Sequence, residues 1–260
     1  MEFAEQEKDE MARSAVEAAR RTEAIVADPA ILRRYRNPPR DTPFGLEYAF
    51  HLFSKIDKKP PVTILDYGCG AGENTIPLAA HGGRVIGMDI SPELVTIARK
   101  RAEAYQLDAE FIVGSAYDTG LASASVDIVF AIAIFHHLDL EAARKELCRI
   151  LKPDGVIIVT EPVRDSKWYG RLRSLLPERE EISAFERPLT RGELDFLSEG
   201  FQCDSIRRFR LPFVAIVDRV SPRLVRPAFV VDRWLLKSFP FLAHFASSEV
   251  RRLTRRPAQI

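Results

Sequence analysis

A glycine-rich turn carries the clearest chemical signal in this sequence. Gly68, Gly70 and Gly72 alternate with other residues between Thr63 and Asn74 (TILDYGCGAGEN), where a short apolar strand runs into a helix. Glycine adopts positive φ readily and lets the backbone approach a ligand that a Cβ would exclude. The N–H groups of the turn and of the helix N-terminus are then free to face that ligand. This spacing predicts a pocket for a nucleotide-sized molecule.

Two acids narrow the type of ligand. A dinucleotide-binding turn reads Gly-x-Gly-x-x-Gly/Ala, but Glu73 stands where its third small residue would fall. Asp66, just before the turn, suits a cationic ligand better than a pyrophosphate. Asp89 ends the next strand, where its carboxylate can accept both hydrogen bonds of a ribose diol, or alternatively cap the following helix. We therefore expect a cationic, adenosine-type ligand.

The elements that must position these residues alternate between strand and helix. Strands are predicted at 62–67, 84–89, 110–114, 126–133 and 155–161, and helices at 73–81, 92–105 and 139–150. This alternation predicts an α/β, Rossmann-like, doubly wound sheet with helices on both faces. Two later strands, 201–210 and 248–255, bring the expected total to seven, mostly parallel with an antiparallel last strand.

The rest of the chain is expected to form segments that surround this sheet: a helical cap, a connector and a helical insert. Residues 1–60 predict a helical cap, with helices at 2–27 and 44–56, and residues 61–260 form the ligand-binding domain. The Asp28–Pro29 pair ends the first helix in this interpretation. Residues 165–188 are expected to be a charged connector that helps to cap the pocket, and 212–245 an apolar helical insert before the last strand.

The balance of charges in the sequence does not indicate a nucleic-acid-binding protein. The 260 residues include 38 basic and 37 acidic side chains, a net charge of +1, so no nucleic-acid partner is required. Residues 201–260 are strongly basic and 1–28 acidic. We favour a solvated basic face, packed against the acidic N-terminal helix, over a binding site for an anionic partner.

Cysteine usage and the N-terminus give the remaining bounds. Cys69, Cys148 and Cys203 form no CxxC pair, so neither a disulfide framework nor a metal site is predicted. The N-terminus is acidic and lacks the apolar stretch of a secretory signal, and no apolar run approaches the roughly 20 residues of a membrane span. A cytoplasmic location is expected.

Between residues 64 and 161 the chain resembles the class I S-adenosylmethionine-dependent methyltransferases, especially the small-molecule branch typified by ubiquinone and menaquinone C-methyltransferases. The matching motifs occur in the family's order: ILDYGCGAGENT, VIGMDISPELVTIARKRA, FIVGSAYDTG, SVDIVFAIAIFHHL and LCRILKPDGVIIVTEP. The resemblance implies S-adenosylmethionine as cofactor, bound by Asp66, Gly68, Cys69, Gly70, Asp89, Ile90, Ser115, Ala116 and Ala131. Ser115 stands where the family usually has an acid for the adenine amino group.

Candidate catalytic residues follow the fourth predicted strand. His136 and His137 titrate near neutral pH and could act as general bases, although we favour a role in capping the next helix and packing against the adenine or the acceptor. Methyl transfer from a sulfonium depends mainly on in-line orientation and exclusion of water. Tyr35, Phe135 and Glu161 are predicted to line the acceptor pocket.

We therefore predict methyl transfer to a small, apolar or amphipathic molecule. Two other hypotheses remain open. The protein could be a cofactor-binding regulator or scaffold without turnover, or an RNA or protein methyltransferase that uses the basic C-terminal region. For 212–245 we favour core packing or a homodimer contact, and a hydrophobic acceptor lid or a surface for anionic lipid are the alternatives.

Overall fold

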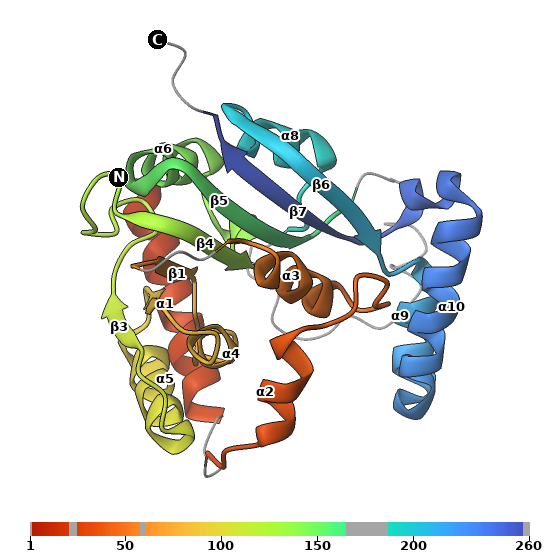
Figure 1. Cartoon of the computed structure of the whole chain (residues 1–260), viewed down its shortest axis with the longest axis horizontal. Coiled ribbons are helices and arrows are strands. Elements are labelled where there is room, and N and C mark those ends of the chain that lie inside the picture. The colour runs from red at the N-terminus through yellow and green to blue at the C-terminus, as the bar shows by residue number, and fades with distance from the viewer. Residues whose placement is uncertain (1, 21–24, 58–60, 165–186, 257–260) are drawn as a thin grey trace.

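A seven-stranded sheet forms the centre of the molecule in a computed structural model, which describes residues 2–20, 25–57, 61–164 and 187–256 (Figure 1). The strand order is β3-β2-β1-β4-β5-β7-β6. Strands β1 to β5 pair in parallel, and β7 pairs antiparallel with both β5 and β6. The strands are β1 (Thr63–Tyr67), β2 (Arg84–Asp89), β3 (Glu110–Val113), β4 (Val126–Ile132), β5 (Leu151–Pro162), β6 (Phe201–Phe209) and β7 (Ser248–Arg255). The predicted mostly parallel sheet with an antiparallel last strand is confirmed.

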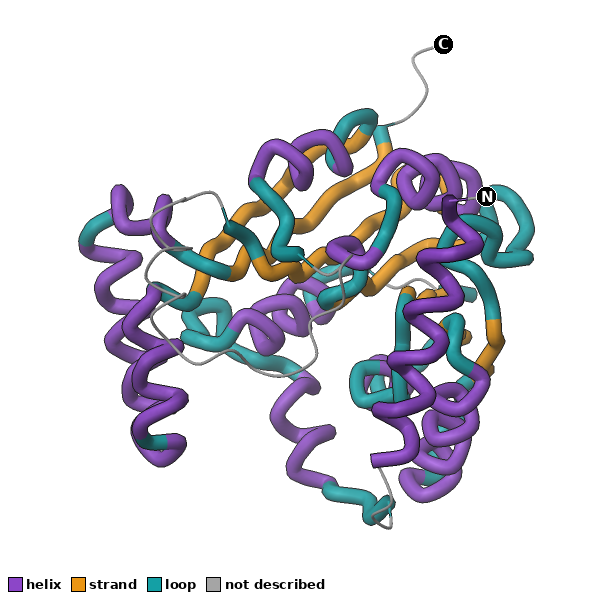
Figure 2. Tube along the Cα trace, turned by 180° about the vertical axis from the view of Figure 1, so that it is seen from behind, coloured by secondary structure: helices purple, strands orange, loops and turns teal. Residues whose placement is uncertain are grey.

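Helices cover both faces of the sheet, as predicted (Figures 1 and 2). One face packs Phe50 and Phe53 against Ile64 and Phe130, and the other packs Leu147 and other residues against the opposite side chains of the same strands. The helices are α1 (Glu2–Arg20), α2 (Pro29–Arg36), α3 (Gly45–Ser54), α4 (Thr75–Ala79), α5 (Pro92–Tyr105), α6 (Leu140–Ile150), α8 (Arg191–Leu197), α9 (Pro212–Val220) and α10 (Val225–Ser238), with short 3-10 turns η1 (Phe135–His137), η2 (Pro222–Leu224) and η3 (Pro240–Phe245).

The strand order creates a crevice at one edge of the sheet. Strands β1 and β4 are neighbours, but the chain leaves β1 toward β2 and returns to β4 from β3. At such a switch point the loops that follow the two strands diverge and leave room for a ligand. The glycine-rich turn follows β1 and the His136–His137 pair follows β4, so the crevice lies between the two motifs that the sequence singled out.

The N-terminal region differs from the prediction at Asp28–Pro29. This pair begins helix α2 instead of ending the first helix: the Asp28 carboxylate accepts a hydrogen bond from Ala30 N at 2.8 Å, and Pro29 occupies the first helical position. Proline fits there because its missing N–H would have no helical partner. Strand β5 also starts four residues earlier than predicted, at Leu151.

Two helical regions lie at opposite ends of the sheet (Figures 1 and 2). Helix α1 packs beside α5 near the β3 edge of the sheet. Helices α9 and α10 come between β6 and β7 in the chain, where a helical insert was predicted, and α10 contacts β6 at the other edge. The acidic α1 therefore does not pack against the basic insert, contrary to the expectation from charge alone. Most of the predicted connector, residues 165–186, lies outside the described residues. Among the described residues, no helix is long and apolar enough to cross a membrane.

Candidate active site

The glycine-rich turn is folded onto the ends of β2 and β4. Gly68 has φ +76°, and a Cβ there would lie 2.2 Å from Ile134 Cδ1, so only glycine fits. Gly70 has φ +51°, but a Cβ on it would meet nothing within 4 Å, because it borders the pocket. Gly68 is thus required by packing within the protein, whereas Gly70 keeps the backbone open toward a ligand.

Asp89 is tied to the same turn. Its Oδ2 accepts a hydrogen bond from Gly70 N at 2.8 Å and its Oδ1 accepts one from Ser91 N at 3.0 Å. The carboxylate lines the pocket, and burial raises its pKa. The cap of α5 is Ser91, whose Oγ accepts from Leu94 N, so Asp89 does not serve as the side-chain cap. Each carboxylate oxygen retains a lone pair for a ligand hydroxyl.

The side chains of Asp66, before the turn, and Cys69, within it, are buried and do not border the pocket. Asp66 is 1% exposed, and its Oδ2 accepts a hydrogen bond from Thr75 Oγ1 at 2.6 Å. Burial raises its pKa to about 7, with smaller contributions from Asp89 and Glu73. The Cys69 side chain packs in a buried cluster against α5, and burial raises its pKa. Asp66 and Cys69, which were predicted to contact the cofactor, are thus not among the residues that line the pocket.

The predicted adenine side of the pocket is partly as expected. Ile90 and Ala116 line the pocket. Ser115 is held by Glu7, to which its Oγ donates a hydrogen bond at 2.5 Å. Ala131 is fully buried within β4, and the lining residue is instead Ala133, which follows the strand with φ +54°.

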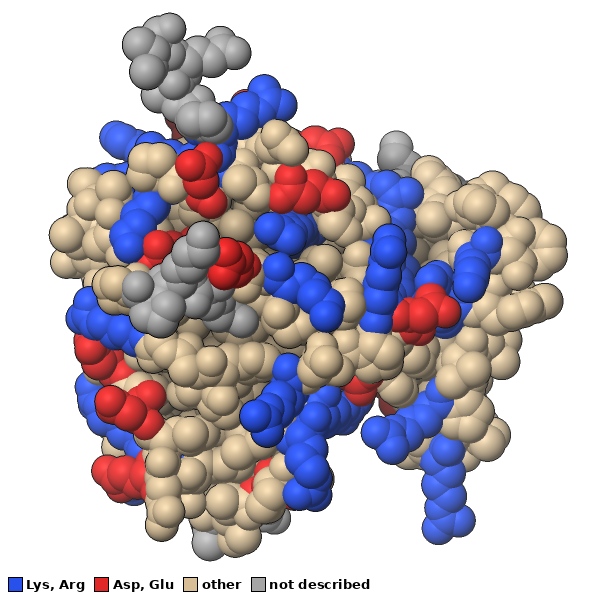
Figure 3. Space-filling model, in the orientation of Figure 1, with Lys and Arg blue, Asp and Glu red and all other residues tan. Residues whose placement is uncertain are grey.

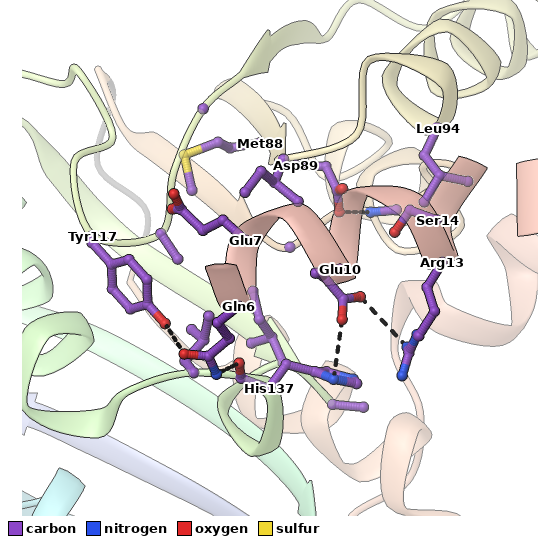
Figure 4. A pocket seen from close by; sticks show the side chains of 18 of the residues that line it. Gln6, Glu7, Glu10, Arg13, Ser14, Met88, Asp89, Leu94, Tyr117 and His137 are labelled. Atoms are coloured by element: carbon purple, nitrogen blue, oxygen red, sulfur yellow. Dashed lines mark hydrogen bonds and ion pairs between the residues drawn. The ribbon is translucent and has the colours of Figure 1, made fainter. Parts of the chain in front are cut away.

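Helix α1 forms the opposite wall of the pocket (Figure 4). Gln6 donates a hydrogen bond to the carbonyl oxygen of His137, and Glu10 lies between His137 Nδ1, at 3.4 Å, and Arg13, at 3.5 Å. The sequence predicted an N-terminal cap but not these contacts. The polar residues at helical spacing in α1 are the sequence pattern that could have indicated this wall. The α1 residues that line the pocket are Gln6, Glu7, Glu10, Arg13, Ser14 and Glu17.

The two histidines have different surroundings. His136 Nδ1 lies 2.8 Å from Glu161 Oε2, and the other oxygen of Glu161 accepts hydrogen bonds from Ile134 N and Phe135 N. Glu161 is fully buried, so it orders the loop after β4 and does not line the pocket as predicted. His136 is 8% exposed and also does not line the pocket.

His137 is the histidine that faces the pocket. Burial, the adjacent ring of His136 and the positive charge of Arg13 lower the pKa of His137 to about 3. The imidazole is therefore neutral at physiological pH and has little affinity for a proton. This property favours accepting or donating a hydrogen bond over acting as a general base.

Two predicted acceptor residues lie elsewhere. Phe135 is fully buried and packs 5.9 Å from the Tyr67 ring. Tyr35 packs on Phe50 and borders a separate cavity between α2, α3 and α5. The structure thus places Phe135 and Glu161 in contact through the Phe135 N–H hydrogen bond but outside the pocket lining, and it places Tyr35 at the separate cavity. Sequence order placed Phe135 and Glu161 near the pocket, but strand geometry turns them into the protein.

The charge of the pocket favours a cation. About 880 Å³ of space, which includes open solvent at the mouth of the pocket, is free of protein atoms. Four carboxylates and one guanidinium border the pocket. The carboxylates are those of Glu7, Glu10, Glu17 and Asp89. A pyrophosphate would be repelled by this wall, whereas a positively charged ligand is attracted to it.

Comparisons with known proteins agree with this geometry. Residues 65–159 match the model of a family described as a methyltransferase domain. The chain is 30% identical over 172 residues to 2-methyl-6-phytyl-1,4-hydroquinone methyltransferase of Synechocystis, covering 63% of this chain and 51% of that protein. It is 35% identical over 107 residues to demethylmenaquinone methyltransferase of Thermus thermophilus, covering 40% of this chain and 49% of that protein. The chain thus spans about half the length of these curated relatives.

A solved structure shows the same fold. Geranyl diphosphate C-methyltransferase from Streptomyces coelicolor, in complex with Mg2+, geranyl diphosphate and S-adenosyl-L-homocysteine, superposes with a TM-score of 0.58 over 80% of this chain and 79% of that one, at 20% identity. The family match, the relatives and the glycine turn with Asp89 converge on one assignment. Residues 65–159 thus match a methyltransferase-domain family, and the comparisons support a class I S-adenosylmethionine-dependent methyltransferase domain with S-adenosylmethionine as its cofactor.

Proposed function

We propose that this protein transfers the methyl group of S-adenosylmethionine to a small amphipathic acceptor bound between α1 and the loop after β4. The observation that carries this proposal is the acidic pocket that joins the glycine turn to His137. The cofactor, when bound, supplies a methyl group on a positively charged sulfur. The residues present fit that group, because four carboxylates border the pocket and Gly70 leaves its backbone open.

The residues of the glycine turn and of β2 hold the cofactor in this proposal. Asp89 accepts hydrogen bonds from the ribose hydroxyls while Gly70 N and Ser91 N keep the carboxylate oriented. Ile90 and Ala116 provide apolar contact for the adenine. Each hydrogen bond to a charged acceptor contributes about 1.5–3 kcal/mol, so Asp89 dominates cofactor affinity.

The residues of α1 and the loop after β4 orient the acceptor. Neutral His137 accepts or donates a hydrogen bond to a polar atom of the acceptor without repelling the sulfonium, since its pKa is lowered to about 3. Ile134 and Leu138 offer apolar contact on the same wall. Helix α1 excludes water from the space between them. Transfer then depends on alignment, and no group on the protein needs to form a covalent bond.

The relatives support an amphipathic acceptor. The Synechocystis relative is named for a hydroquinone with a phytyl chain, which has a polar ring and a long apolar tail. The pocket offers both kinds of contact, with Glu10 and His137 for a hydroxyl and Ile134 and Leu138 for hydrocarbon. We infer an acceptor of the same chemical class, an aromatic ring with a hydroxyl group and an alkyl chain.

The test has two stages. Isothermal titration should first detect binding of S-adenosylmethionine and S-adenosylhomocysteine. Incubation with methyl-labelled cofactor should then place label in alkylated 1,4-hydroquinones, and not in the same compounds with both hydroxyls blocked. Failure to bind either form of the cofactor would refute the enzymatic proposal as a whole.

The same labelling experiment separates the alternatives. Binding of both cofactor forms, with no label transferred to any component of a cell extract, would indicate a regulator or scaffold. Label in RNA with a steep salt dependence would favour a nucleic-acid methyltransferase that uses the basic C-terminal region. Label in protein would indicate a protein methyltransferase.

A further inference from the structure

The insert between β6 and β7 turns an apolar face toward solvent. Along α10 the exposed apolar positions, Pro227, Val230, Val231 and Trp234, recur every three or four residues and form one stripe along the helix. Trp234 is 60% exposed. A surface helix normally shows the reverse pattern, with its apolar side toward the core. The outward face of α10 therefore carries large apolar side chains, beside the exposed Arg226 and Lys237, where polar ones are usual.

The orientation of α10 is fixed by contacts on its other side. Asp232 is fully buried, and its carboxylate accepts hydrogen bonds from Arg210 N at 3.0 Å and Leu211 N at 2.7 Å. Phe229 packs 5.2 Å from Phe44 of the N-terminal cap. Rotation of the helix would bury Trp234 only by exposing Asp232 and breaking both hydrogen bonds. The apolar stripe thus belongs to the folded protein.

The same face continues beyond α10. The Phe239 ring lies 6.1 Å from Trp234 and 6.2 Å from Phe241, which is 70% exposed, so three aromatic rings form one exposed cluster. On α9 and the following turn, more aliphatic side chains are exposed. The exposed apolar residues of the insert, which we call the insert face, are Ile216, Val220, Leu224, Val230, Val231, Trp234, Phe239, Phe241 and Phe245.

Positively charged side chains lie among the exposed apolar residues of the insert. Figure 3 shows this lobe as a mainly neutral surface with Lys and Arg side chains among the neutral ones. Arg219, Arg223 and Lys237 are exposed on the insert. Of the two acids of the insert, Asp232 is buried, and Asp218, whose side chain is 42% exposed, lies 3.6 Å from Arg210. The insert therefore combines exposed aromatic rings with a positive rim.

We propose that the insert face docks this protein on the surface of an anionic lipid bilayer. Aromatic rings settle at the boundary between headgroups and acyl chains, and Lys and Arg side chains extend to the lipid phosphates. A second copy of the chain fits less well, because a two-fold contact would bring the same patch, with Arg219 and Arg223, against itself. This docking goes beyond the proposed methyl transfer and needs no cofactor.

Vesicle sedimentation of the full chain tests the proposal. Binding to vesicles of phosphatidylcholine with phosphatidylserine should exceed binding to phosphatidylcholine alone by about tenfold or more, and should weaken at high salt. Trp234→Ser with Phe241→Ser should weaken binding to the anionic vesicles about tenfold or more. Arg219→Gln with Arg223→Gln should weaken binding to anionic vesicles about 10- to 30-fold and leave binding to neutral ones unchanged.

Matched controls come from exposed residues elsewhere on the protein. Val26→Ser with Val113→Ser removes apolar side chains, and Lys100→Gln with Lys145→Gln removes two charges; both should bind as the wild type does. Absence of binding to anionic vesicles, or full binding by both insert variants, would overturn the proposal. So would light scattering that finds a dimer in the absence of lipid that Trp234→Ser with Phe241→Ser dissociates, because the insert face would then hold a second copy.

Discussion

The two walls of the active-site pocket are built in different ways. The floor, Gly68, Gly70 and Asp89, is held by backbone hydrogen bonds between the ends of neighbouring strands. The lid, helix α1, reaches the pocket through side chains, with Gln6 bonded to His137 and Glu7 to Ser115, residues more than a hundred positions apart in the chain. The floor is thus part of the folded core, whereas a few polar contacts hold the lid. Changes to the floor should therefore have larger effects than changes to the lid.

The largest effect is expected on stability, from a Cβ at Gly68. Gly68→Ala should lower the free energy of unfolding by about 4 kcal/mol, because it combines a positive φ with a clash against Ile134. Gly82→Ala is the matched control: its φ is also positive, at +81°, but a Cβ there would meet nothing within 4 Å. It should cost only about 1 kcal/mol in urea unfolding. Equal losses at both sites would show that packing under the floor is unimportant.

The second effect is on cofactor binding. Asp89→Ala should weaken binding of S-adenosylhomocysteine about 100-fold, or about 3 kcal/mol, since it removes a charged acceptor for two hydroxyls. Titration calorimetry measures this directly. Asp108→Ala, which changes an exposed acid in the loop between α5 and β3, should bind as the wild type does. A change of less than threefold at Asp89 would mean that the ribose binds elsewhere.

The difference between floor and lid also explains what the sequence could predict. The strands and helices from 63 to 162 follow from local hydrophobic periodicity, and the helix 92–105 matched to the residue because Ser91 and Pro92 mark its start. The glycine spacing could likewise identify the pocket, because it is a local pattern within a few consecutive residues. The prediction at Asp28–Pro29 was wrong because this pair occurs both after a helix and at the start of one. The hydrogen bond from Ala30 N to the Asp28 carboxylate shows that it begins helix α2 here.

Side-chain direction could not be predicted in the same way. Phe135 and Glu161 lie near the pocket in sequence order, yet both are fully buried. Phe135 turns inward in the 3-10 turn after β4, and Glu161, near the end of β5, accepts hydrogen bonds from the backbone of Ile134 and Phe135. The α1 residues that border the pocket depend on how the helix docks, which is a long-range contact. Motif spacing therefore located the floor, and only the folded structure identified Glu10 and the other lid residues.

A smaller effect is expected from His137, which lies between floor and lid. Its pKa is about 3 in the folded protein and about 6.5 in an unfolded chain, so the unfolded state binds the proton first as the pH falls. The wild type should lose stability relative to His137→Gln between about pH 6.5 and pH 3, by about 2 kcal/mol at pH 5. Urea unfolding at pH 8 and pH 5 measures the difference, with His244→Gln, at an exposed histidine, as control. The same difference at both pH values would place His137 in a solvated environment.

The smallest effect is expected from the lid itself. Glu10→Gln weakens the contact with neutral His137 and the ion pair with Arg13, and a partly exposed ion pair contributes about 0.5–1 kcal/mol. The dissociation rate of S-adenosylhomocysteine, followed by stopped flow, should therefore rise about threefold, while Glu103→Gln on the exposed side of α5 leaves it unchanged. A loss of turnover of about 100-fold with an unchanged dissociation rate would give Glu10 a direct role in the reaction. The lid would then belong with the floor as part of the chemical machinery, because a contact that only closes the pocket cannot slow transfer without also changing release.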